Sequence, residues 1–240
     1  MPNVEVTLPG GRSTAGVVRI GDTVRRPTSA KSHFIHGVLR HLESRQFAGA
    51  PRLLGVDECG REILSYLPGM VPAELGEVND RQCIAAAKLL RSLHDATADC
   101  GLKGNGETIC HGDPSPCNCV FVDGMPQAFI DFDEAHAGSR GDDLGYAAWL
   151  WLDFGNGDLS AEYQGRRLAD FAAAYDAPAE WDVPGMVLDA QDRVIEKPDW
   201  PSGPRQWARN CKAWTQENID RIRSAFVMRS NTSPERTRDR

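Results

Sequence analysis

One short window in the middle of the chain carries the side chains best suited to chemistry. It combines one imidazole, one amide and three carboxylates, from His111, Asp113, Asn118, Asp131 and Asp133. Carboxylate and amide oxygens are the ligands that Mg²⁺ prefers, and the ion keeps several waters when it binds them. Phosphoryl transfer needs such positioning and charge neutralisation, and a carboxylate near an acceptor hydroxyl can take up its proton. The pattern suits a magnesium-assisted phosphoryl-transfer site, and the His-Gly-Asp run taken alone suits an ordinary turn equally well.

Short strands on both sides of a loop must hold these side chains together. Residues 109–113 and 118–122 flank a proline-containing loop, and residues 127–132 are predicted to form the return strand. Asp123 and Gly124 between them are typical of a two-residue hairpin turn. This arrangement can bring three groups together at one edge of the hairpin: the carboxylate of Asp113, the amide of Asn118 and the carboxylate of Asp131.

The flanking segments predict a strand-rich first part and a helix-rich second part. Residues 1–27, 51–55 and 62–67 show β-branched or alternating runs, and residues 32–44 have helical spacing. After a break at Pro68-Gly69, four more segments have helical patterns, at residues 79–94, 142–152, 159–175 and 207–228. We therefore expect an α+β chain with a nucleotide-binding part over residues 1–70 and a catalytic, acceptor-binding part over residues 71–240.

Composition and charge narrow the class of protein further. The 240 residues include 27 Lys and Arg against 34 Asp and Glu, which gives a formal net charge of -7. This balance argues against nucleic acid or a membrane as a partner and suits a cationic substrate, although mild acidity also aids solubility. The sequence shows neither a signal-peptide pattern nor an apolar run of about 18 residues. Seven irregularly spaced cysteines suit a reducing compartment, so we expect a cytoplasmic protein.

Several ordered motifs resemble one superfamily. The segment from His111 to Asn118 (HGDPSPCN) resembles the catalytic loop of the aminoglycoside phosphotransferase and choline kinase-like superfamily, which is distantly related to protein kinases. Further segments resemble its hinge, a helix ending in Leu-His, its metal-binding segment and the stretch after it, at residues 63–69, 87–95, 130–133 and 138–149. The resemblance covers roughly residues 10 to 152. It implies a bilobal, protein-kinase-like fold in which the mainly helical second lobe carries a catalytic hairpin.

The resemblance also implies an activity and roles for the central residues. The expected enzyme is a phosphotransferase that uses ATP or GTP and Mg²⁺ and has an alcohol group of a small molecule, aminoglycoside-like or other, as acceptor. By position, Asp113 is the catalytic base and His111 braces its loop. Asn118 and Asp131 hold the metal, and Asp133 assists them.

The nucleotide side of the site departs from the family pattern. The resemblance places the adenine against the hinge backbone of Ser65 to Leu67. Arg25, with Arg26 as the other choice, stands where kinases have the lysine of the third strand, and Arg presents a planar fork instead of a point charge. The following helix has its only acid, Glu43, at the far end, and residue 35 or 36 falls where the pairing glutamate is expected.

Alternatives remain open from the sequence alone. A catalytically impaired, nucleotide-binding protein would explain the departures, although it would have no need to keep the whole catalytic set. A metal-dependent hydrolase would lack its usual paired histidines or bridging acids. Zinc at Cys110, Cys117 and Cys119 would lack the usual cysteine spacing. Residues 9–16 are glycine-rich and suit a phosphate-covering loop or a plain turn equally, and no motif after Leu152 identifies the acceptor.

Overall fold

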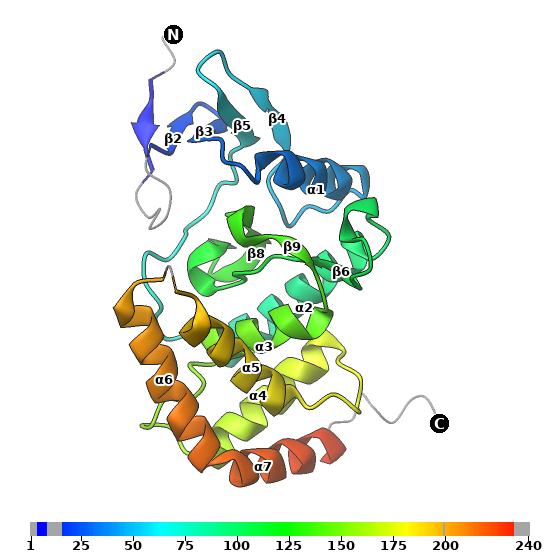
Figure 1. Ribbon diagram of the computed structural model, residues 1–240, viewed down its shortest axis with the longest axis vertical. Helices are drawn as coiled ribbons and strands as arrows, with labels where there is room; N and C mark the ends of the chain where they lie inside the picture. Colours follow the sequence, from blue (N-terminus) through cyan, green and yellow to red (C-terminus); the bar gives the residue numbers. More distant parts are fainter. Residues whose placement is uncertain (1–3, 9–15, 199, 233–240) are drawn as a thin grey trace. The chain divides into compact units, whose positions relative to one another are not determined.

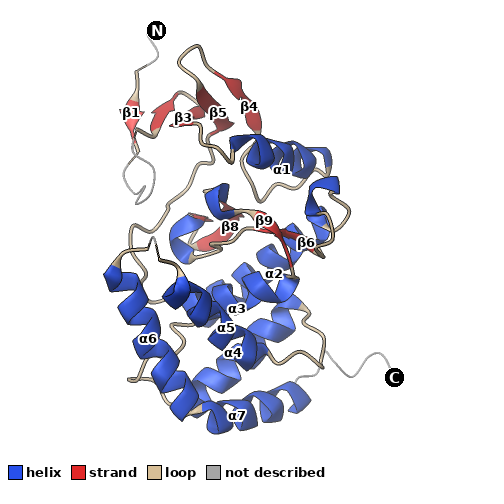
Figure 2. Cartoon of the chain, in the orientation of Figure 1, coloured by secondary structure: helices blue, strands red, loops and turns tan. Residues whose placement is uncertain are grey.

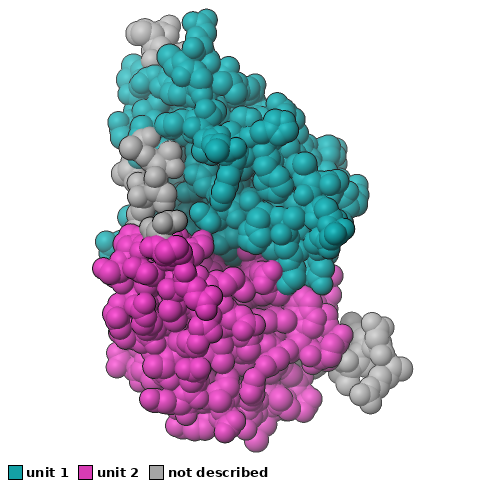
Figure 3. Space-filling view, in the orientation of Figure 1, with its two compact units in different colours: residues 1–76, 92–140 teal, residues 77–91, 141–240 magenta. Residues whose placement is uncertain are grey.

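The fold is seen in a computed structural model that describes residues 4–8, 16–198 and 200–232. The glycine-rich segment 9–16 therefore lies, except for its last residue, outside the described residues. Contacts group the chain into two compact units, residues 1–76 with 92–140 and residues 77–91 with 141–240 (Figure 3). This grouping does not test a functional boundary, so the predicted division at residue 70 stays a prediction.

An antiparallel sheet forms the first part of unit 1, as predicted (Figure 1). Helix α1 follows the third strand and buries the apolar side chains of Ile35, Val38, Leu39 and Leu42, which recur at helical spacing. The sheet has the order β1-β2-β3-β5-β4. These elements are β1 (Val6–Thr7), β2 (Val18–Ile20), β3 (Thr23–Pro27), α1 (Ser32–Ser44), β4 (Leu53–Val56) and β5 (Arg61–Ser65).

Two short strand pairs form the second part of unit 1. Strand β6 (Thr108–Cys110) pairs with β9 (His136–Gly138), and β7 (Cys119–Val122) pairs with β8 (Met125–Phe129). The β7–β8 turn uses Asp123 and Gly124, as the sequence predicts, with φ angles of 51° and 74°. The return strand is shorter than predicted, because the chain leaves β8 and enters a short 3₁₀ turn at Phe132–Glu134.

The remaining long elements of the described residues are helices, which confirms the predicted α+β class (Figure 2). The predicted helix over 207–228 is two helices, because Asn218 ends the first one by donating its amide nitrogen to the carbonyl of Trp214. The segment after residue 178, which shows no clear pattern, contains a further helix. The helices are α2 (Asp80–Thr97), α3 (Arg140–Trp151), α4 (Ala161–Tyr175), α5 (Val183–Glu196), α6 (Ser202–Glu217) and α7 (Ile219–Thr232).

Aromatic side chains fill the interior of unit 2. Trp149 and Trp151 of α3, Phe171 of α4 and Tyr175 at its end are almost completely buried. The ring of Trp149 stacks on Trp207 of α6 with centroids 4.7 Å apart, so these aromatic residues serve packing. None of the helices in the described residues is long and apolar enough to cross a lipid bilayer.

Candidate active site

His111 ties the loop after β6 to the strand beyond the hairpin. Its ring is buried and packs against Phe129 and Phe132, with centroids 5.4 and 4.5 Å away. Its Nδ1 lies 3.3 Å from the backbone nitrogen of Asp113, and its Nε2 lies 3.0 Å from the carbonyl oxygen of Ile130. A backbone N–H can only donate, so Nδ1 accepts and Nε2 carries the proton that it donates to Ile130. The imidazole therefore supports the residues on either side of the site.

Asp113 and Asn118 are in direct contact. The amide nitrogen of Asn118 donates to Oδ2 of Asp113 over 2.9 Å and to the backbone oxygen of Asp113 over 3.1 Å. The backbone oxygen of Asn118 accepts from the N–H of Ile130 over 2.9 Å. Because the nitrogen of the Asn118 amide faces Asp113, the amide oxygen is the atom that can bind a cation.

Asp131 sits in an unusual backbone conformation. Its φ and ψ are 64° and 67°, which lie in the left-handed region that residues other than glycine rarely adopt. Such positions persist where the surroundings impose them, and they cluster at functional sites. Burial raises the pKa of Asp131, the guanidinium of Arg26 opposes that rise, and the neighbouring carboxylate of Asp133 adds to it.

Arg26 of β3 brings three acids together. Its Nη1 lies 3.2 Å from Oδ1 of Asp131, and its Nη2 donates to a carboxylate oxygen of Asp133. On the other side of the guanidinium, Nε forms an ion pair with Oε1 of Glu62 over 3.1 Å. Glu62 lies opposite Arg26 in the β3–β5 register, and its Oε2 lies 2.7 Å from Nε2 of His36 on α1.

Arg25, the first choice for the phosphate-binding cation, makes different contacts. Neighbouring residues of a strand point to opposite faces. Arg25 donates to the hydroxyl of Thr23 over 2.6 Å and approaches Oδ2 of Asp57 at 3.8 Å. The structure thus joins Arg26, and not Arg25, to the predicted metal ligand Asp131. Glu62 is absent from the sequence prediction, and the pairing of β3 with β5 is the signal that could have found it.

The predicted hinge residues differ in how their backbones are used. Ser65 donates its N–H to the carbonyl of Arg52 over 2.9 Å, and its hydroxyl oxygen accepts from the N–H of Arg52 over 2.8 Å. The N–H of Tyr66 donates to the carbonyl of Asp22 over 2.9 Å. Ser65 is therefore less available than Leu67 for an adenine, and both assignments stay predictions.

The oxygen ligands and the charge balance fit a divalent cation. Asp131, Asp133 and Glu62 share the guanidinium of Arg26, and the ammonium of Lys31 donates to the backbone oxygen of Asp133 over 2.9 Å and lies 4.0 Å from Oε2 of Glu134. The four carboxylates therefore outnumber the two cations. Burial disfavours the charged form of Asp131, as its raised pKa indicates, and a bound cation would relieve that cost. Carboxylate oxygens from Asp131 and Asp133 and the amide oxygen of Asn118 are hard donors of the kind that Mg²⁺ takes.

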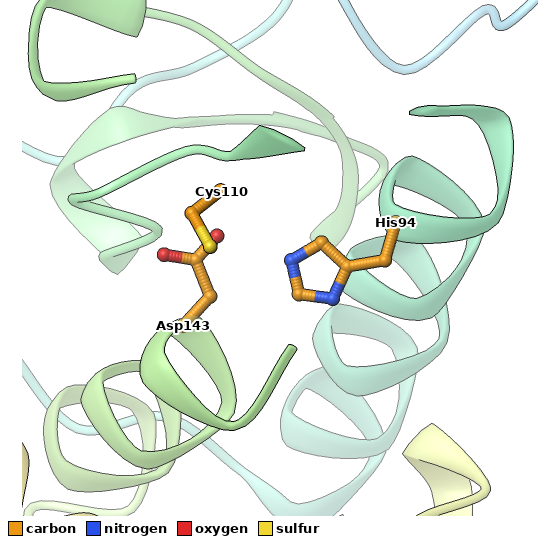
Figure 4. Close-up of side chains that lie close together, drawn as sticks. All are labelled: His94, Cys110 and Asp143. Carbon is orange, nitrogen blue, oxygen red and sulfur yellow. The ribbon is translucent and has the colours of Figure 1, made fainter. Parts of the chain in front are cut away.

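A histidine and a cysteine lie close together in the interior of unit 1. His94 of α2 and Cys110 of β6 face each other with possible ligand atoms within 4.8 Å (Figure 4). Both are completely buried, and the Cys110 thiol donates to the carbonyl of Ser139 over 3.2 Å. Figure 4 also shows Asp143, which lies in the first turn of α3, where the helix dipole stabilises a carboxylate.

The other two cysteines of the loop do not support a zinc site. Among the described residues, neither Cys117 nor Cys119 belongs to a cluster of three possible metal ligands. Burial raises the pKa of the Cys119 thiol to about 12, so this thiol is neither a ready ligand nor a nucleophile at neutral pH.

The fold of this chain is similar to those of solved phosphotransferases and kinases. The fold matches an aminoglycoside phosphotransferase of Streptomyces rimosus in complex with ADP and streptomycin, with a TM-score of 0.53, 13% identity, and coverage of 83% of this chain and 90% of that one. It matches an ethanolamine kinase of Plasmodium vivax with a TM-score of 0.56, 12% identity, and coverage of 87% and 80%. At these identities the likeness shows the fold alone.

The sequence is also similar to the trifolitoxin immunity protein of Rhizobium leguminosarum bv. trifolii. The two are 33% identical over 174 residues, and the match spans 66% of each protein. The model of the phosphotransferase enzyme family matches residues 2–108 and 105–183, which is well over half of the chain. The chain therefore belongs to the phosphotransferase enzyme family, as the motifs predict.

Proposed function

We propose that this protein transfers the γ-phosphoryl group of ATP or GTP to a hydroxyl group of a small molecule, with Mg²⁺ as cofactor. The observation that carries the proposal is the contact of Asp113 with Asn118. One carboxylate oxygen, Oδ2, is held by the amide nitrogen, and the loop that bears both residues is tied to Ile130, directly before Asp131. A carboxylate positioned in this way can orient an acceptor hydroxyl and accept its proton.

Each residue has a distinct part in this proposal. Asp113 receives the proton of the acceptor hydroxyl on Oδ1, because Oδ2 accepts from Asn118. His111 keeps the loop in place through its bonds to Asp113 and Ile130. Asn118 and Asp131, with Asp133 beside them, would hold Mg²⁺, which neutralises phosphate charge when bound. The hinge at Ser65 to Leu67 would bind the adenine.

The replacement of Asp113 by Asn tests the proposal directly. The new amide keeps the shape of the side chain, and its oxygen can still accept from Asn118, but it cannot take up a proton. We expect kcat to fall by about 10²–10⁴-fold, as for the loss of a general base, with nucleotide affinity little changed. Mg²⁺-dependent turnover should be measured with ATP and GTP against aminoglycosides, choline, ethanolamine and sugars.

A matched control and three outcomes make the test decisive. Asp123→Asn changes an exposed acid at the tip of the neighbouring hairpin, and it should leave turnover unchanged. Equal turnover of wild type and Asp113→Asn would refute the assigned base. Nucleotide binding without turnover on any acceptor would favour the catalytically impaired alternative, and no nucleotide binding at millimolar concentration would refute both.

A second candidate function is protection of a cell against a toxin. The 33% identity to the trifolitoxin immunity protein favours it. Expression of wild type in a strain sensitive to trifolitoxin should then raise the tolerated dose, and Asp113→Asn tells whether protection needs the catalytic base. If expression of the wild-type protein does not raise the tolerated dose of trifolitoxin, this candidate function is refuted and the phosphotransferase proposal is unaffected.

A further inference from the structure

We propose that Glu62 and His36 are positioning residues that fix the guanidinium of Arg26 against Asp131 and Asp133, and thereby set the affinity of the site for the phosphate part of the nucleotide. This inference rests on the proposed phosphotransferase function. It assigns a role to a strand residue and a helix residue that the sequence motifs leave without one.

The guanidinium of Arg26 is divided between two tasks. Its Nε edge faces Glu62, while Nη1 and Nη2 face Asp131 and Asp133. An arginine can do this because its donors form a rigid planar fork, whereas a lysine offers one compact ammonium group. The Nε edge is therefore held by the ion pair with Glu62, without an aligned hydrogen bond at Nε, and the Nη edge is the part directed at the predicted metal ligands.

Glu62 is held firmly enough to act as the anchor. It is 4% exposed and pairs with Arg26 across the β3–β5 register. His36 approaches the second carboxylate oxygen of Glu62 at 2.7 Å, so the acid has a partner at each oxygen. Without Arg26 the buried carboxylate would carry an uncompensated charge, and without His36 its second oxygen would lose its hydrogen-bond partner, so Glu62 and Arg26 must keep their orientations together.

Glu62 supplies the acid that is missing at the pairing position of α1. Strand β5 provides the carboxylate for Arg26, and α1 provides His36, which contacts that carboxylate. Helix α1 therefore contacts the guanidinium of Arg26 through Glu62 and not directly. Arg25 takes no part, because it contacts Thr23 and Asp57, and it is a matched control of the same residue type on the same strand.

Binding of ADP and of adenosine separates positioning from general stability. Adenosine lacks the phosphates, so a change that only loosens the fold weakens both ligands, whereas a change at Arg26 weakens ADP alone. We expect Arg26→Ala to lose at least about tenfold in Mg²⁺-ADP affinity, as for the loss of charge-assisted hydrogen bonds. Glu62→Gln and His36→Leu should show smaller losses of the same kind. Arg25→Ala should bind both ligands as wild type does.

Conservative variants test the chain of contacts itself. His36→Gln keeps a nitrogen donor for Glu62 and should restore ADP affinity relative to His36→Leu. Arg26→Lys keeps the charge but loses the fork, so it should bind ADP less tightly than wild type. This variant also tests the inference if Arg26→Ala does not fold, with the thermal melting curve of each variant as the check.

The outcomes distinguish this inference from the function on which it rests. If wild type binds ADP and both Arg26→Lys and Glu62→Gln bind it equally well, the inference fails while the phosphotransferase proposal stands. If Arg25→Ala loses ADP affinity in their place, the inference fails and the first choice from the sequence is correct. An Asp113→Asn protein with full turnover would refute the proposed base without affecting ADP binding. A wild type that binds no nucleotide would refute both proposals.

Discussion

Gly112→Ala is expected to destabilise the loop that carries Asp113. Gly112 has a φ of +83°, a conformation that residues with a side chain rarely adopt. A Cβ added there would lie 2.2 Å from the carbonyl oxygen of Glu134 and 2.7 Å from its carbonyl carbon. These are backbone atoms of the 3₁₀ turn that follows Asp131, so they cannot move aside as a flexible side chain would.

The two parts of the cost can be estimated separately. The left-handed backbone costs an alanine about 1–2 kcal/mol, and forcing an atom into a packed position typically costs about 1–3 kcal/mol. Gly124→Ala is the matched control, because Gly124 has a φ of +74° and nothing within 4 Å of the added Cβ. It should show the backbone cost alone. The difference between the two variants, about 1–3 kcal/mol, then measures the close approach to Glu134.

Thermal unfolding measures this difference. Each kcal/mol lowers Tm by about 2–4 °C in a chain of this size class. We expect Gly112→Ala to melt several degrees below Gly124→Ala and to lose turnover, since the loop on either side of it holds His111 and Asp113. Equal melting temperatures of the two alanine variants would refute the packing of this loop against Glu134.

Three further predictions concern stability and thiol chemistry elsewhere in the chain. Gly165→Ala should lower Tm, because the added Cβ would lie 2.6 Å from a carbonyl oxygen of α7. Asp57→Asn should reduce stability at neutral pH, because hydrogen bonds led by that from the Arg61 N–H lower the pKa of Asp57. This contribution is present above the unfolded pKa of about 3.9 and is lost as pH falls through the lower folded value, so acid unfolding curves of the two proteins should converge. Iodoacetamide at pH 8 should label exposed Cys59 quickly and leave Cys119 unlabelled, since burial raises the Cys119 pKa to about 12; mass spectrometry of the digested protein gives both rates.

Local patterns explain why the catalytic window is readable from the sequence. Asp113 and Asn118 are five residues apart on one loop, and the Asp123-Gly124 turn sets the register of the strands on either side. Proximity along the chain therefore brings these groups together. The break between α6 and α7 is harder to predict, because the periodic pattern continues through Asn218 and only its capping bonds end the first helix.

The choice between Arg25 and Arg26 depends on strand pairing and face, which local sequence does not determine. Both are arginines on the same short strand, and a shift of one residue exchanges the face that each presents. The pairing of β3 with β5 places Glu62 opposite Arg26 and Ile63 opposite Arg25. A buried arginine with an acid opposite is stabilised on its side of the sheet, which is the physical reason why Arg26 points toward Asp131.

The position of Glu62 also changes how the missing helix acid is interpreted. The lack of a glutamate at the pairing position of α1 favours an impaired protein only if no other acid can hold Arg26 of β3. Glu62 holds it from β5, and a planar guanidinium can face that acid and the carboxylates of Asp131 and Asp133 at the same time. In our proposal, Arg26 and Glu62 together take the places of the expected lysine and helix glutamate. On this proposal, the departure from the family pattern is a retained site with a different support, and not a degraded one.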